Sequence, residues 1–130
     1  MDLNKKVRYF WEEEACGTSP HLIKEKKLQS KTWFEEIEEY RYSVEPFIHS
    51  IAKFTTHQGK KVLEIGVGAG TDHLNWARAD VDLYGVDMTK TAIKTTKRRL
   101  KIYDLKSNLQ RVNAENLPFE DESFDIIYSW

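Results

Sequence analysis

Residues 62–72 read VLEIGVGAGTD, and this segment decides the fold. A β-rich run at 61–65 precedes three glycines at alternating positions, and residues at helical spacing follow over 71–79. Glycines at such a junction let the backbone turn sharply and expose bare N–H groups, while the start of the helix favours a carboxylate or phosphate. The segment therefore predicts a strand, a ligand-binding loop and a helix.

Three other interpretations of the glycine loop are weaker. A dinucleotide-binding loop follows G-x-G-x-x-G and needs a glycine at position 71, where this chain has Thr71. A phosphate-binding P-loop closes on G-K-S/T, and no such triplet follows the glycines. A tight turn without a ligand does not explain three alternating glycines at the end of a strand. The loop is therefore predicted to bind a ligand of another class.

Strand-like and helix-like segments alternate after residue 59. Strands are predicted at 61–65, 83–86, 108–112 and 124–128, and helices at 71–79 and 88–103. Strands separated by helix-length segments form parallel βαβ units with right-handed crossovers. The predicted class is α/β, with a Rossmann-like parallel sheet of about four strands.

The first 58 residues are predicted to form an N-terminal arm and helices. Ser30 can cap a helix whose apolar face carries Trp33, Phe34, Ile37 and Tyr40. Pro46 suits the first turn of a second short helix that Gly59 ends, with an apolar stripe of Phe47, Ile48, Ile51 and Ala52. Residues 1–30 mix acidic and basic runs, which favours an irregular, solvated or partly mobile arm over a specific binding element.

Asp87 ends the second predicted strand, 17 positions after Gly70. In an open parallel sheet its carboxylate lies beside the glycine loop, where it can accept hydrogen bonds from two ribose hydroxyls. Met88 can then pack against the edge of an adenine. A helix cap is the alternative role for Asp87, and the glycine loop upstream favours ribose binding.

Two further motifs follow the third predicted strand. Residues 113–119 read NAENLPF and residues 123–125 read SFD. With the glycine loop and the Val86-Asp87 pair, their order resembles the class I S-adenosylmethionine-dependent methyltransferases of the small-molecule type, whose signatures read E-x-G-x-G-x-G, V-D, A-E-x-L-P-F and S-F-D. The resemblance covers residues 60–130. It implies a sheet of order 3-2-1-4 over residues 59–130, the first four strands of a seven-strand fold.

The resemblance also implies a function and a set of site residues. The cofactor is S-adenosylmethionine, and the reaction is methyl transfer to a small-molecule acceptor, with a non-catalytic module that binds S-adenosylmethionine or S-adenosylhomocysteine as the alternative. The matched positions are Glu64, Gly66, Gly68 and Gly70 at the methionine end, Asp87 on the ribose, Met88, Ala114 and Glu115 around the adenine, and Ser129 as the floor near the methyl group. Asp125 also matches a family position, and we expect it to be structural.

No convincing catalytic base is found. His73 follows the glycine loop and is expected to be a surface or packing residue, and the other three histidines are expected at the surface. In methyltransferases that resemble this chain, helices ahead of the first strand often cover the cofactor as a lid. Tyr40, Arg41 and Tyr42 are the lid candidates here, although core packing with an exposed arginine is favoured.

Composition limits the remaining possibilities. A net charge of −1 gives no reason to expect nucleic acid or a membrane as partner, and one cysteine, Cys16, suggests a reducing cytoplasm and no multi-cysteine metal site. The basic residues between 90 and 101 resemble the solvated face of a helix. The chain would end directly after strand four, and truncation is favoured over a natural short form. If the chain folds, we expect a homodimer that shields the edge of strand 124–128.

Overall fold

The computed structural model describes residues 2–130 and contains one four-stranded parallel sheet. The elements are α1 (Leu3–Glu13), α2 (Lys31–Val44), α3 (Ile48–Ala52), the 3-10 helix η1 (Phe54–Thr56), β1 (Lys61–Ile65), α4 (Thr71–Arg78), β2 (Asp82–Asp87), α5 (Lys90–Ile102), β3 (Asn108–Arg111) and β4 (Ile126–Tyr128). The strands lie in the order β3-β2-β1-β4, and every neighbouring pair is parallel. The predicted class and strand order are confirmed.

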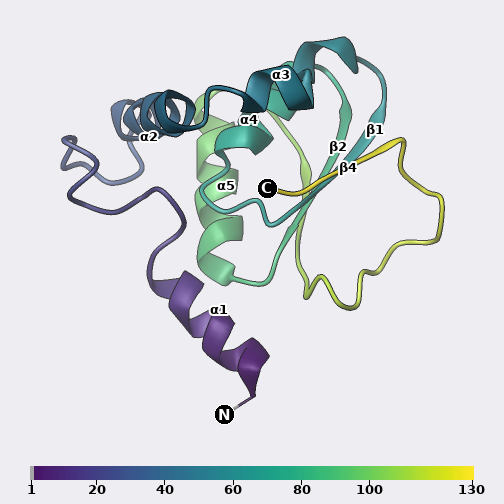
Figure 1. Ribbon diagram of the computed structural model, residues 1–130, viewed down its shortest axis with the longest axis horizontal. Coiled ribbons are helices and arrows are strands. Elements are labelled where there is room, and N and C mark those ends of the chain that lie inside the picture. Colours follow the sequence, from purple (N-terminus) through teal and green to yellow (C-terminus); the bar gives the residue numbers. More distant parts are fainter. Residues whose placement is uncertain (1) are drawn as a thin grey trace.

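The two faces of the sheet are covered differently. Helices α2 to α5 gather on one side of the sheet (Figure 1). On that side Val62 and Leu83 pack with Trp76 of α4. On the other face, Tyr84 of β2 meets two aromatic rings from the long segment between β3 and β4. These rings belong to Phe119 and Phe124. Because all four strands are parallel, their carboxyl ends lie at one edge of the sheet, where the predicted ligand loop also lies.

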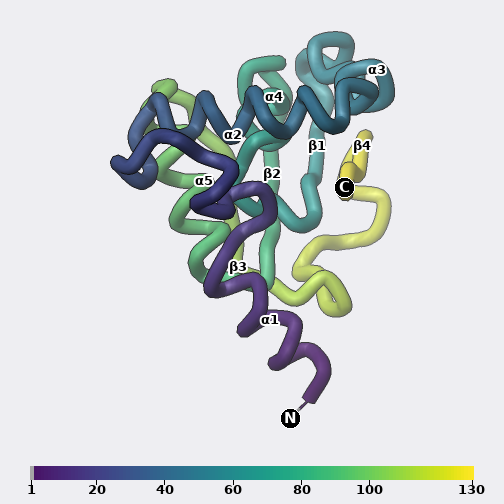
Figure 2. The backbone as a smooth tube through the Cα atoms, turned by 60° about the vertical axis from the view of Figure 1, so that its left-hand side comes forward, coloured from purple at the N-terminus to yellow at the C-terminus, as the bar shows by residue number. Residues whose placement is uncertain are grey.

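Residues 2–30 were predicted to be irregular and solvated, but they contain a solvated helix in their first half and a buried residue, Ile23, in their second. Residues 3–13 form α1, which Asp2 caps and which lies beyond the carboxyl ends of β2 and β3 (Figure 2). Ile23 is buried against Trp33 and Phe34 of α2. The segment is held by contacts with distant parts of the chain, and composition alone gave no sign of these.

Two helix boundaries test the capping predictions. Ser30 caps α2 as expected, because its hydroxyl accepts from the backbone N–H of Trp33 at 3.2 Å. Gly59 does not end the second short helix. That helix, α3, stops at Ala52, and Lys53 turns the chain in a left-handed conformation at φ 49°.

Burial also corrects the predicted solvated face of α5. Arg99 is fully buried, whereas its neighbour Arg98 is exposed. At the opposite side of the sheet, β4 pairs only with β1 among the described strands, and Ile127 remains 63% exposed. Asp125 has the structural role that was expected, since its carboxylate accepts from the N–H of Lys61 at 2.8 Å and aligns β4 with β1.

Candidate functional site

The glycine loop joins β1 to α4 at the carboxyl edge of the sheet. Gly66 and Gly70 have φ angles of 81° and 77°, a region that residues with a side chain rarely adopt. The N–H of Gly66 donates to the carbonyl of Val86 at 2.8 Å, which ties the loop to the end of β2. The sequence therefore needs glycine here for the turn itself, as predicted.

Asp87 links the loop to the start of α5. Its Oδ2 accepts from the N–H of Gly68 at 3.1 Å, and its Oδ1 accepts from the N–H and the hydroxyl of Thr89, each at 2.9 Å. A carboxylate has about four acceptor positions, and these contacts occupy three of them. Asp87 is half-buried, so Oδ2 keeps an acceptor position for a ligand hydroxyl. Its cap-like and ligand-binding roles are therefore compatible.

A cavity of about 380 Å³ opens at this point, within the range of roughly 300–1,000 Å³ typical of small-molecule sites. Its walls come from the ends of β1 and β2, the segment after β3, α1 and the end of the chain. They comprise Val7, Trp11, Cys16, Ile65, Gly66, Gly68, Val86, Asp87, Met88, Thr89, Ala92, Val112, Asn113, Ala114 and Trp130. Five of the nine predicted site residues, namely Gly66, Gly68, Asp87, Met88 and Ala114, are therefore brought together.

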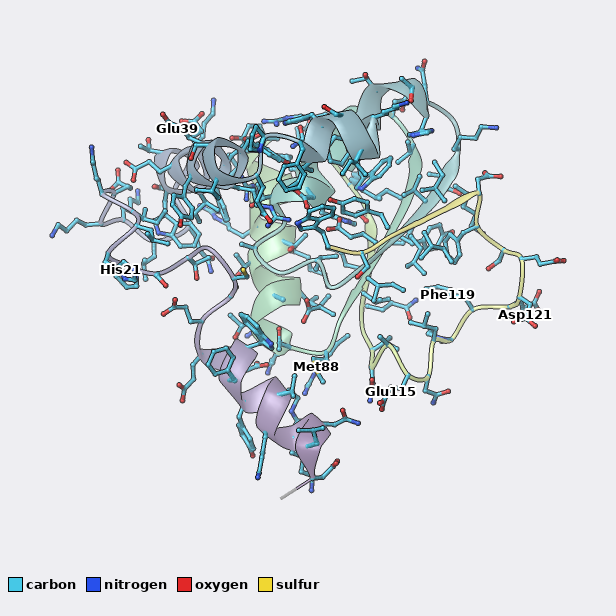
Figure 3. All side chains as sticks on the ribbon, in the orientation of Figure 1. His21, Glu39, Met88, Glu115, Phe119 and Asp121 are labelled. Atoms are coloured by element: carbon cyan, nitrogen blue, oxygen red, sulfur yellow. The ribbon has the colours of Figure 1, made fainter. Side chains whose placement is uncertain are left out.

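Three other predicted site residues lie near the cavity without lining it. Gly70 is buried against α5, and a Cβ there would lie 2.8 Å from the hydroxyl oxygen of Thr96. Glu115 is exposed on the loop after β3, at the same edge as Met88 (Figure 3). The hydroxyl of Ser129 donates to the carbonyl of Ile65 at 3.1 Å, and its neighbour Trp130 lines the cavity instead.

Glu64, the fourth, points into the protein. Its Oε2 lies 2.8 Å from Nδ1 of His73, and Nε2 of His73 lies 2.8 Å from the hydroxyl of Ser107. His73 is completely buried, so it is a packing residue and not a surface one. Burial raises the pKa of Glu64 well above its usual value, helped by the charge of Asp72, and lowers the pKa of His73 to about 3. Burial therefore favours the neutral form of both groups.

Helix α1 forms a wall that the sequence analysis missed. Val7 and Trp11 line the cavity, and the carboxylate of Glu12 accepts from the N–H groups of Lys90 and Thr91 at 3.0 and 3.2 Å. These are unpaired donors at the start of α5, so Glu12 caps that helix from 78 residues away.

The other end of α1 is also attached. The side chain amide of Asn4 donates to Glu115 at 2.8 Å. Helix α1 thus bridges the segments after β2 and β3, although none of its residues is buried. Leu3, Val7 and Trp11 recur at helical spacing, a signal that the surrounding charges obscured.

The predicted lid residues lie elsewhere. Arg41 donates to the buried carboxylate of Asp72 at 2.7 Å, and the hydroxyls of Tyr42 and Tyr128 donate to the same carboxylate at 2.9 Å. Burial, with the charge of Asp72, raises the pKa of both tyrosines, which keeps them as neutral donors. None of Tyr40, Arg41 and Tyr42 lines the cavity, and the side chain of Arg41 is only 22% exposed.

Residues 2–130 contain neither a metal-binding cluster nor a membrane-spanning helix. No cluster of three or more histidine, cysteine, aspartate or glutamate side chains there could hold a metal ion. None of the helices in that range is long and apolar enough to cross a membrane.

The parallel sheet, the glycine loop and the carboxylate at the end of β2 define an α/β domain with a nucleotide-type cofactor site. A family model described as a methyltransferase domain matches residues 62–130. The chain belongs to this family, as the motifs predicted.

Curated relatives agree with this assignment. Phthiotriol/phenolphthiotriol dimycocerosates methyltransferase 1 of Mycobacterium ulcerans is 38% identical over 81 residues, which are 61% of this chain and 29% of that protein. Demethylmenaquinone methyltransferase of Paenarthrobacter aurescens is 39% identical over 67 residues, or 52% of this chain and 25% of that protein. The chain thus spans less than a third of the length of either relative.

Solved structures support the fold. The YcgJ protein of Bacillus subtilis is 31% identical with a TM-score of 0.58, over 65% of this chain and 37% of that one. Magnesium protoporphyrin IX methyltransferase of Synechocystis, solved with bound S-adenosylmethionine, has a TM-score of 0.69 over 99% of this chain and 62% of that one. Its identity is 12%, so this likeness concerns the fold alone.

Proposed function

We propose that this chain binds S-adenosylmethionine and supplies the cofactor-binding half of a methyltransferase that acts on a small-molecule acceptor. The observation that carries the proposal is the position of Asp87, which borders the cavity with one acceptor position unused, beside the N–H of Gly68. Two further facts support the proposal. The chain belongs to the methyltransferase family, and each of the two relatives is named for a small-molecule compound.

Each wall of the cavity then has a task. The carboxylate of Asp87 accepts one hydrogen bond from a ribose hydroxyl, Met88 and Ala114 flank the adenine, and Gly66 and Gly68, which have no side chains, leave room for the methionine end beside the backbone. The cofactor supplies an activated methyl group for in-line attack by the acceptor, so the protein contributes mainly position and exclusion of water.

The bonding of His73 supports a mechanism without a histidine base. His73 is enclosed, and its two ring nitrogens are engaged by Glu64 and Ser107. It therefore has no access to an acceptor in the cavity. Glu64, in the same way, is proposed to support the loop from inside and not to contact the cofactor.

Helix α1 is proposed as the lid over the adenine end, in place of the residues on α2. Trp11 and Val7 give it an apolar inner surface, and Glu12 and Asn4 hold it closed at its two ends. Because no residue of α1 is buried, only a few contacts oppose its opening. This combination suits an element that must move to admit the cofactor.

The free edge of β4, with exposed Ile127, supports a second copy of the chain as partner. The single cysteine supports a reducing, cytoplasmic setting. Light scattering tests the first point: a dimer is expected, and a monomer whose β4 amides are protected from exchange would contradict it.

Calorimetric titration of the chain with S-adenosylmethionine, S-adenosylhomocysteine and NAD tests the cofactor assignment. We expect the first two to bind and NAD not to bind. Asp87→Ala should weaken binding sharply, whereas Asp82→Ala, at the exposed start of β2, should leave it unchanged. Absence of binding by a folded sample would refute the proposal. Binding without methyl transfer in the complete protein would favour the non-catalytic alternative.

A further inference from the structure

Arg99 lies directly behind the glycine loop. One of its terminal nitrogens, Nη1, donates to the carbonyl of Ala69 at 3.3 Å and to the hydroxyl of Thr71 at 2.7 Å. The other, Nη2, donates to the carbonyl of Phe34 in α2 at 2.9 Å. A single side chain of α5 thus connects the glycine loop, the first residue of α4 and helix α2.

The environment of Arg99 is unusual for a cation. The side chain is fully buried, and the carboxylate of Glu38 is 3.9 Å away, too far for a hydrogen bond. Its Nε has no hydrogen-bond partner within residues 2–130, although the ring of Phe34 lies 4.9 Å from the guanidinium. Burial lowers the pKa of Arg99 to about 10, so the group stays charged at neutral pH. Burying a cation costs free energy. Two of the three hydrogen bonds that Arg99 donates go to the glycine loop and to Thr71, where the loop joins α4.

Thr96, one turn earlier on α5, makes a matching contact. Its hydroxyl donates to the carbonyl of Gly68 at 3.2 Å. Two successive carbonyls of the loop, those of Gly68 and Ala69, are therefore drawn toward α5. Because the C=O and N–H of a planar trans peptide point in opposite directions, these bonds also fix the direction of the N–H groups that follow.

We propose that Arg99 is a positioning residue for the cofactor loop: it holds the loop from behind in the conformation that receives the cofactor, without touching the cofactor itself. The inference rests on the proposed function. Binding sites depend on such supporting contacts, because a loop that must be ordered on binding loses affinity. The same guanidinium bonds α2, so the docking of α2 and the affinity for the cofactor are coupled through it.

The test compares three variants by calorimetric titration with S-adenosylhomocysteine, each at a temperature where urea unfolding shows it to be folded. Arg99→Met should raise the dissociation constant by about tenfold, the size of a lost charge-assisted hydrogen bond. Arg99→Lys should recover part of the loss, since an ammonium reaches Thr71 but not the three acceptors together. Arg98→Met, at the exposed neighbouring position, should bind S-adenosylhomocysteine with the same dissociation constant as the wild-type chain.

A variant of Thr71, the hydrogen-bond partner of Arg99, keeps the proposal testable if Arg99→Met does not fold. Thr71→Val retains the size of the side chain but removes the acceptor at 2.7 Å, and it should raise the dissociation constant by several-fold. Unchanged affinity in folded Arg99→Met, or in Thr71→Val, would show that Arg99 only stabilises the fold. If the unchanged chain does not bind S-adenosylhomocysteine, the proposed function itself fails, a result distinct from either variant's.

Discussion

The buried pair of Glu64 and His73 gives stability an unusual dependence on pH. The hydroxyl of Ser107 donates to the carbonyl of Leu83 at 3.1 Å, so it accepts from Nε2–H of His73. The contact between Nδ1 and Glu64 must then contain a second proton. Since burial raises the pKa of Glu64 and lowers that of His73, this proton resides on Glu64. The folded pair therefore holds one titratable proton.

The sign of the effect follows from the unfolded chain. There Glu64 loses its proton near pH 4.5 and His73 near pH 6.5. Below about pH 4.5 the unfolded pair holds two protons and acid destabilises the fold, whereas between these values the proton counts are equal. Above about pH 6.5 the unfolded pair holds none, so the free energy of unfolding falls by about 1.4 kcal/mol per pH unit until the folded Glu64 ionises.

Glu64→Gln removes this proton while its amide N–H can still donate to Nδ1. The stability of the wild-type chain relative to the variant should fall as the pH rises from about 6.5 to 8, by about 1.4 kcal/mol per pH unit as long as the folded Glu64 keeps its proton. Urea unfolding followed by tryptophan fluorescence at both values measures the difference, and groups common to the two proteins cancel. Glu13→Gln on exposed α1 is the control. A difference that does not change with pH would show that the folded pair carries no such proton.

Three further variants test individual contacts. Asp72→Asn should lower the free energy of unfolding by about 1.5–3 kcal/mol in urea titrations, because it removes the buried negative charge that accepts from Arg41, Tyr42 and Tyr128, whereas exposed Asp82→Asn should have little effect. Gly85→Ala should cost about 1–3 kcal/mol, since an added Cβ lies 2.5 Å from the buried histidine; a neutral result would contradict this packing. Glu12→Ala should weaken S-adenosylhomocysteine binding up to about fivefold and speed proteolysis after α1, unlike Glu13→Ala.

Local patterns predicted most of the sheet. The bounds of β1 were predicted to the residue and those of the other strands within two residues, and Ser30 caps α2 as expected. These features depend on residues close together in the sequence. The same holds for the position of the glycine loop beside Asp87, which follows from neighbouring parallel strands that end at one edge.

The parts that sequence could not predict depend on contacts between distant segments. Arg99 belongs to a run of cations, and nothing local distinguishes the one that faces the loop. Helix α1 owes its position to Glu12, which pairs with an amide 78 residues away. Glu64 occupies a motif position that was predicted to bind the cofactor. Its contact with His73 depends on the packing of α4 against β1, which the local sequence does not show.

We propose that one cavity joins the glycine loop, the end of β2 and α1 around a single cofactor. Backbone amide NMR of the isotope-labelled chain, titrated with S-adenosylhomocysteine, tests it most directly. We expect saturable shifts at Gly66, Gly68, Met88 and Ala114, together with the indole N–H of Trp11, and none at exposed Lys101 on the far end of α5. Shifts confined to other surfaces, or no shifts in a folded sample, would contradict it.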